Sequence, residues 1–235
     1  MTVFVHGFTQ TERSWLPVID VPRPGSQQEG GVELSILARI PRAATFVETV
    51  ERLVRFPGSY VGYSQGGRLC LQLALDHADV VHRLALVSAS PGIAEDAARA
   101  ARRTADDQLA REIERDGVDA FLDRWLAQPL FASLPADRAG LTERRQANTV
   151  ERLTTQLRVL GQGSQPSNWH RLGELAIPVL LIVGALDTKY VAIAEQMAAA
   201  ISDVHVEVIP DAGHACHLEQ PEQVAHLLRS WSGSA

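Results

Sequence analysis

Short apolar runs recur along the chain at the length of β-strands. The run Val179–Val183 is apolar throughout, which indicates a strand buried on both faces, as in a parallel sheet. The other runs are rich in β-branched or aromatic residues. The predicted strands are Thr2–His6, Val32–Leu37, Tyr60–Ser64, Leu84–Ser88, Val179–Val183 and His205–Ile209.

Apolar residues at helical spacing lie between most of these strands. Phe46, Val50 and Leu53 form one such pattern, and Val224, Leu228 and Trp231 form another near the end of the chain. Strands that alternate with helices are joined by right-handed crossovers. We therefore predict an α/β fold with a mostly parallel, doubly wound sheet of about six strands. Two further helical patterns are Leu69, Leu73 and Ala74, and Ile193, Met197 and Ile201.

One long segment interrupts the alternation. Residues 93–172, between the fourth and fifth predicted strands, show helical patterns and no convincing strand. Gly161–Pro166 is typical of a loop that leaves such a segment. We expect residues 1–235 to form a single domain, with a helical cap at about 93–172.

Composition narrows the class of protein. The net charge of −6 and the lack of a basic stretch free of acidic neighbours argue against a nucleic-acid partner. Cys70 and Cys216 lie far apart, without the spacing of a metal site, and two thiols fit a reducing compartment. The apolar start, Met1–Gly7, is too short for a secretory signal or a membrane span. We expect a cytoplasmic protein without membrane insertion, and the sequence predicts no particular oligomeric state.

The motif Gly62-Tyr63-Ser64-Gln65-Gly66-Gly67 carries the strongest chemical signal. It follows a predicted strand and precedes a predicted helix, which is the context of a nucleophile on a sharp turn. Glycine is needed at 62 and 66 because a Cβ there would collide with a neighbouring element. The turn lifts the hydroxyl of Ser64 clear of the sheet, at the positive end of the next helix. The alternative is a glycine-rich turn that happens to carry a serine.

A serine hydroxyl needs a base, and His214 is the candidate. It follows the sixth predicted strand, in a loop where parallel sheets place their sites. His217 is a rival three residues on, and His214, Cys216 and His217 together leave a weak alternative of a metal site. We predict no metal.

Asp187 follows the fifth predicted strand and is the candidate for the acid that orients the imidazole. An Asp in front of a helix is also an ordinary N-cap, so this residue alone decides little. The chain order Ser64, Asp187, His214 is the order that the α/β-hydrolase fold uses.

The segment His6-Gly7-Phe8 follows the first predicted strand. Gly7 allows close approach of the backbone, so the amides of Phe8 and Gln65 can form an oxyanion hole. The alternative is a simple turn at the end of a strand.

With these motifs the chain resembles the α/β-hydrolase superfamily over nearly its whole length. It is more closely similar to the 2-succinyl-6-hydroxy-2,4-cyclohexadiene-1-carboxylate (SHCHC) synthases of menaquinone biosynthesis, which eliminate pyruvate from their substrate, SEPHCHC. The segments that carry this likeness are Val5–Thr9, Gly62–Arg68, Ser90–Ile93, Trp125–Leu134, Asp187–Tyr190 and Ala212–Glu219.

The resemblance implies a small polycarboxylate substrate and no metal or organic cofactor. By alignment of motifs it implies that Arg68, Arg102 and Arg145 bind the carboxylates and that Tyr63 and Trp125 line the pocket. Arginine suits this task because its planar fork matches a carboxylate. From charge pattern alone, Arg102 fits a solvated helix face and Arg68 a surface position.

The resemblance also implies that Ser64 acts as a base on a ring C–H, while the Phe8 and Gln65 amides hold the developing negative charge. The alternatives are a carboxylesterase or C–C bond hydrolase with the same triad, and a ligand-binding protein without activity. The chain departs from the family pattern at Ala38–Ala44, where the loop is short and lacks the usual glycines, which changes the pocket rim near Arg39 and Arg42.

Overall fold

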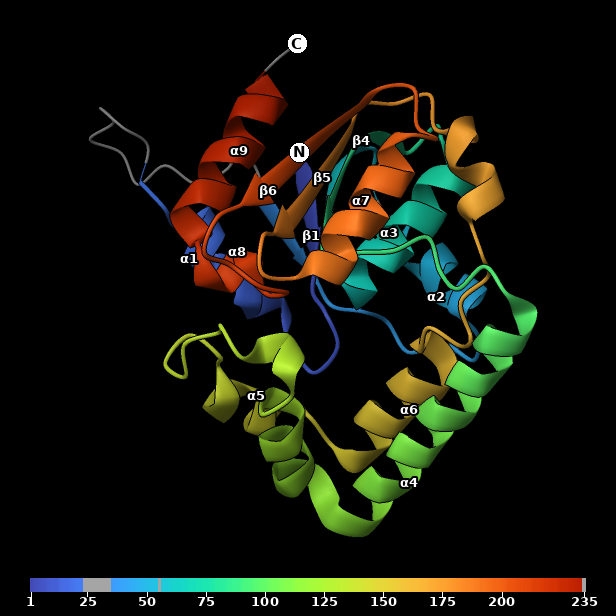
Figure 1. Cartoon of the computed structure of the whole chain (residues 1–235), viewed down its shortest axis with the longest axis vertical. Helices are drawn as coiled ribbons and strands as arrows, with labels where there is room; N and C mark the ends of the chain where they lie inside the picture. The colour runs from blue at the N-terminus through green and yellow to red at the C-terminus, as the bar shows by residue number, and fades with distance from the viewer. Residues whose placement is uncertain (23–34, 55, 234–235) are drawn as a thin grey trace.

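A computed structural model describes residues 1–22, 35–54 and 56–233 (Figure 1). Its strands form one sheet, all of it parallel, in the order β2-β1-β3-β4-β5-β6. The predicted α/β fold is therefore confirmed. The strands are β1 (Thr2–Val5), β2 (Ser35–Ala38), β3 (Gly58–Tyr63), β4 (Val81–Val87), β5 (Val179–Gly184) and β6 (Val204–Ile209). The predicted strand Val32–Leu37 begins outside the described residues, and its described part lies in β2.

Helices cover both faces of the sheet. On one face lie α2 (Phe46–Leu53), α3 (Gln65–Asp76) and α7 (Thr188–Ala198), and their side chains share a core with the strands. On the other face lie the short helices α1 (Leu16–Ile19) and α8 (Cys216–Glu219) and the longer α9 (Pro221–Gly233). None of the helices in the described ranges is long and apolar enough to cross a membrane.

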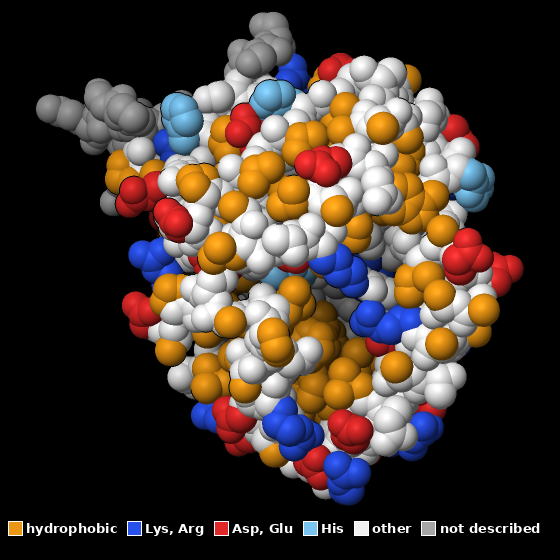
Figure 2. Space-filling view, in the orientation of Figure 1, with side chains coloured by type: hydrophobic (Ala, Val, Ile, Leu, Met, Phe, Trp, Pro, Cys, Tyr) orange, Lys and Arg blue, Asp and Glu red, His pale blue; other side chains and the backbone are white. Residues whose placement is uncertain are grey.

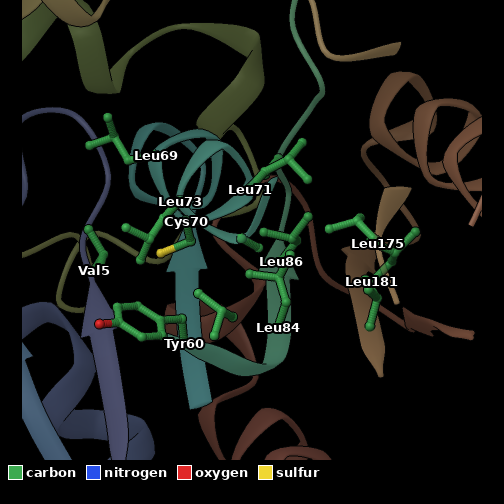
Figure 3. Close-up of a cluster of buried hydrophobic side chains, with 14 of the residues drawn as sticks. Val5, Tyr60, Leu69, Cys70, Leu71, Leu73, Leu84, Leu86, Leu175 and Leu181 are labelled. Atoms are coloured by element: carbon green, nitrogen blue, oxygen red, sulfur yellow. The ribbon is translucent and has the colours of Figure 1, made fainter. Parts of the chain in front are cut away.

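Alternation along the strands explains the apolar runs in the sequence. In β5, Leu181 belongs to the core under α3 and α7, whereas Leu180 and Ile182 belong to the core under α8 and α9. Successive side chains of a strand point to opposite faces, so both sets must be apolar when both faces are covered. Figure 3 shows part of the first core, with Leu69 and Leu73 of α3 above the sheet.

The segment between β4 and β5 is helical and forms a cap beside the C-terminal edge of the sheet (Figure 1). It contains α4 (Asp96–Leu126), α5 (Leu141–Ala147) and α6 (Val150–Leu160), with 3-10 helices at Pro129–Phe131 and Trp169–Glu174. The cap has an apolar core of its own, made by Ala110, Ile113, Phe121, Leu122, Leu153 and Leu157. The predicted insertion of a helical cap between the fourth and fifth strands is confirmed. The assignment of residues 1–235 to a single domain stays a prediction.

A bend divides the long helix α4. Gly117 has a φ of 80° and a ψ of 175°, values outside the helical region, and an added Cβ there would meet no atom within 4 Å. Only glycine adopts such a positive φ without strain. The bend turns the second half of α4, which carries Phe121 and Trp125, towards the body of the protein.

Candidate active site

Ser64 stands at the sharp turn between β3 and α3. Its φ of 49° and ψ of −108° are strained for a residue with a side chain, at a typical cost of about 1–3 kcal/mol. A Cβ on Gly62 would lie 2.5 Å from the Cα of Gly67, and one on Gly66 would lie 2.5 Å from the carbonyl oxygen of His6. The turn therefore has no room for a side chain at either position, which agrees with the predicted need for glycine.

His214 lies between Ser64 and Asp187. Its Nε2 is 3.1 Å from Ser64 Oγ, and its Nδ1 is 2.7 Å from Asp187 Oδ2. His214 and Asp187 are both buried, so the pair is shielded from water. A carboxylate on Nδ1 favours the tautomer that carries its proton there, which leaves Nε2 free to accept the Ser64 hydroxyl proton.

Asp187 has two partners, so it acts both as the N-cap of α7 and as the contact of His214. Its Oδ1 accepts a hydrogen bond of 3.4 Å from the amide of Tyr190 and so caps α7, while Oδ2 contacts His214. The N-cap therefore fixes the carboxylate in the orientation that meets the imidazole.

The loop that carries His214 is held by a buried glutamate. Glu219, 4% exposed, accepts hydrogen bonds from the amides of Gly213 at 2.8 Å and Ala215 at 3.1 Å. These amides flank His214 on both sides. Charge-assisted hydrogen bonds of this kind are the stronger ones in proteins, so Glu219 restrains the backbone of the imidazole.

His217, the rival base, lies behind the site. It is fully buried, packs against Tyr63 with the rings tilted by 42° and their centroids 4.2 Å apart, and has its Nε2 3.4 Å from Nε2 of Gln10. Burial holds the pKa of His217 well below its usual value. Within the described ranges no group of three His, Cys, Asp or Glu side chains is arranged to hold a metal.

Ser64 and His214 open into a cavity of about 350 Å³ between the sheet and the cap. Figure 2 shows this side of the molecule with a hollow that has a hydrophobic floor and Lys or Arg side chains at its edge. The polar and charged lining includes Gln65, Arg68, Arg102, Asp106, Gln128, Gln162 and Lys189, and the aromatic lining is Phe8, Tyr63, Trp125, Phe131 and Tyr190.

The two amides predicted for an oxyanion hole belong to segments at this cavity. Gln65 opens α3, whose first intrahelical bond runs from the amide of Arg68 to the carbonyl of Ser64, so the earlier amides have no partner within the helix. The turn before Phe8 is fixed, because the Gly7 amide donates to Gln10 Oε1 at 3.2 Å.

The structure brings two of the three predicted arginines to the cavity. Arg68 is buried and donates to Gln165 Oε1 at 3.0 Å and to the carbonyl of Leu160 at 2.6 Å. Burial lowers its pKa to about 10, which leaves it charged at neutral pH. Arg68 is therefore a buried residue of the site and not a surface residue.

Arg102 lies on α4 and lines the same cavity. It donates to Asp106 Oδ1 at 2.8 Å and to Gln162 Oε1 at 2.7 Å. Arg145 does not line the cavity, and its guanidinium pairs with Asp123 at 2.7 Å. The structure thus leaves Arg145 outside the group formed by Ser64, Arg68 and Arg102.

Lys189 and Tyr190 line the cavity and were not predicted as site residues. The Tyr190 ring centroid lies 4.6 Å from that of His214, and the Tyr190 hydroxyl accepts a hydrogen bond of 3.1 Å from Gln162. The signal that could have found them is their place in the first turn of α7, directly after Asp187, because that turn begins at the edge of the sheet where the site lies.

Comparison with known proteins agrees with this architecture. A model described as "Alpha/beta hydrolase family" matches residues 2–227. A Bacillus subtilis protein named putative 2-succinyl-6-hydroxy-2,4-cyclohexadiene-1-carboxylate synthase is 33% identical over 241 residues, which cover 96% of this chain and 88% of the relative. A Salmonella paratyphi C protein named 2-succinyl-6-hydroxy-2,4-cyclohexadiene-1-carboxylate synthase is 30% identical, with 97% and 93% covered.

Solved structures give the same result. One described as MenH from S. aureus superposes with a TM-score of 0.83 at 28% identity, covering 98% of this chain and 92% of that one. A thermophilic esterase from Thermogutta terrifontis, at 21% identity and a TM-score of 0.72 with 98% and 88% covered, shares the fold. The chain belongs to the alpha/beta hydrolase family and is similar along nearly its whole length to relatives named SHCHC synthase.

Proposed function

We propose that the protein is an SHCHC synthase, which eliminates pyruvate from SEPHCHC in menaquinone biosynthesis. The observation that carries the proposal is the position of His214, in contact with both Ser64 and Asp187 at a cavity whose walls hold cationic side chains. Relatives that are 30–33% identical over almost the full chain bear that name. A polycarboxylate would find positive charge beside the triad.

The proposed reaction breaks a C–H bond of the ring and the C–O bond to the enolpyruvyl group. The electron pair of the C–H bond shifts through the ring and expels enolpyruvate, which takes up a proton and becomes pyruvate. The proton balance closes within the triad. His214 Nε2 takes the hydroxyl proton of Ser64, Oγ takes the ring proton, and His214 returns its proton to the leaving group.

In this proposal, two features of the chain lower the energy that is needed to form an alkoxide at Ser64. Asp187 at 2.7 Å stabilises the imidazolium that forms on His214. The N-terminus of α3, directly after Ser64, favours negative charge at the serine oxygen. The amides of Phe8 and Gln65 would hold the charge that develops on the conjugated carbonyl oxygen, at about 3 kcal/mol for each donor in the transition state.

The carboxylates of the substrate require cations, and we assign them to the cavity wall. Arg68 and Arg102 take two of them, with Tyr63 and Trp125 as apolar surfaces beside them. Lys189 takes the third in this assignment. It replaces Arg145, because Lys189 lines the cavity and Arg145 pairs with acidic residues outside its lining.

Release of pyruvate from freshly generated SEPHCHC, coupled to lactate dehydrogenase, tests the proposal. We expect turnover by the wild-type protein and its loss in Ser64→Ala. Arg115→Met, an exposed change on α4, serves as the matched control and keeps full activity. Hydrolysis of p-nitrophenyl esters is measured in the same preparation. Ser64-dependent ester hydrolysis without pyruvate release would contradict the proposal and favour a carboxylesterase.

A further inference from the structure

A second cavity, also of about 350 Å³, lies between α6 and the loop that follows β2. This loop is the segment 39–44, directly after β2. No described residue lines both this cavity and the one at Ser64. Helix α6 separates them, since Leu157 faces the triad cavity whereas Arg152 and Gln156 face the second one.

The second cavity has a wall of three arginines, Arg39, Arg42 and Arg152. In the described part of the chain, Nη2 of Arg152 is buried and has no hydrogen-bond partner. Burial lowers the pKa of Arg152, and repulsion from Arg39 lowers it further. Nη2 has almost no contact with solvent, so an anion in the cavity reaches it only after the Arg152 side chain turns towards the cavity. Pairing there would remove the cost of a buried nitrogen without a partner.

The other two arginines are held loosely. Arg39 pairs with Glu12 at 3.4 Å, and Arg42 donates to both carboxylate oxygens of Glu151, at 3.1 and 3.4 Å. Both arginine side chains are about two-thirds exposed, at 68% and 67%. Ion pairs this exposed contribute little to stability. Both side chains can therefore leave these pairs and turn to a ligand beside Arg152.

The rest of the wall offers apolar surface. Ile40 and Pro41 come from the loop, and Val159 comes from α6. We propose that this cavity binds a small organic anion, with a phosphate or carboxylate group on the three arginines and an apolar body against these side chains. The proposal stands apart from the catalytic function, because no residue of the triad takes part in it.

Titration of the full-length, ¹⁵N-labelled protein with phenyl phosphate, followed by NMR, tests the proposal. We expect saturable shifts in the amides of residues 39, 40, 42 and 43 and of residues 152–159. Arg152→Met raises the dissociation constant at least about tenfold, as loss of a charge-assisted fork predicts. Arg42→Met, an exposed change that leaves folding intact, raises it by a smaller factor. Arg115→Met on α4 and Ser64→Ala leave it unchanged.

Two further probes separate the sources of affinity. Phthalate carries carboxylates in place of phosphate, so its titration shows which anionic group the arginines prefer, and saturable binding of either probe at these residues supports the site. Phenol carries the ring without charge. Equal affinity for phenol, shifts confined to other parts of the protein, or unchanged affinity in both Arg152→Met and Arg42→Met would overturn the proposal.

Discussion

Glu219 is expected to control catalysis although it does not line the cavity. Its carboxylate accepts two backbone hydrogen bonds, from Gly213 and Ala215, and is 4% exposed. In Glu219→Gln one acceptor oxygen becomes an NH₂ group, which faces an amide N–H that it cannot pair with. A hydrogen bond to a charged group contributes about 1.5–3 kcal/mol, and an unpaired buried donor costs about 1–3 kcal/mol. We therefore expect the free energy of unfolding to fall by about 3 kcal/mol.

The same change is expected to loosen the backbone on both sides of His214. A displacement of about 1 Å at a catalytic group can reduce the rate about 100-fold. We expect kcat for pyruvate release to fall by about that factor while KM changes little, because no cation of the cavity is altered. Urea unfolding and steady-state kinetics on the same samples measure the two effects. Glu222→Gln, an exposed change in the first turn of α9, is the matched control.

Two results would refute this reasoning. If Glu219→Gln unfolds at the same urea concentration as the control, the two hydrogen bonds do not stabilise the fold. If stability falls but kcat stays within about twofold of wild type, the loop does not depend on Glu219 to position His214. A fall in kcat with a parallel rise in KM would also count against the argument, because it would indicate a wider disturbance of the cavity.

Burial lowers the pKa of His6 from 6.5 to about 4, so between these pH values His6 binds a proton more readily in the unfolded chain than in the folded protein. We therefore expect the free energy of unfolding to fall by about 3 kcal/mol from pH 6.5 to pH 4. Urea unfolding of His6→Asn is expected to show a smaller fall over the same range. Gly66→Ala places a Cβ 2.5 Å from the carbonyl oxygen of His6 and lowers the melting temperature strongly, whereas Gly173→Ala, with no contact under 3.7 Å, does not. Asp187→Asn keeps the cap of α7 but favours the wrong tautomer of His214, so kcat falls by about 10²–10⁴ with little change in thermal stability.

The strands were predictable because burial on both faces leaves a strong pattern. The residues at which the strands begin and end were less predictable. β4 begins at Val81, whereas the sequence predicted a start at Leu84. The prediction began too late because His82 is exposed and Arg83 partly exposed, so the first residues of the strand do not form an apolar run. A strand end that reaches solvent has polar positions, and these look like a loop in the sequence.

The residues of the site were predictable where a local motif carries them. Ser64 lies in a turn that a short glycine-rich motif defines, and Asp187 and His214 lie in the loops that follow β5 and β6. The surroundings of Arg68 were not predictable, because its partner Gln165 lies 97 residues further along the chain. The same holds for Arg145, whose partners on α4 were set by the packing of cap helices and not by spacing in the sequence.

Phe8 links the cap to the predicted oxyanion hole. Its ring lies edge-on to the rings of Trp125 and Phe121, with centroid separations of 5.2 and 6.1 Å. Both of these residues belong to the second half of α4. The residue whose backbone amide we predict for the oxyanion hole is therefore also one against which the cap packs. Arg102 lies in the first half of α4, before the bend at Gly117, so the contacts of Phe8 position the second half of the helix and not Arg102. Two aromatic contacts thus join the cap to the loop after β1, and because Phe8 and Trp125 also line the cavity, the same packing supplies part of its apolar surface.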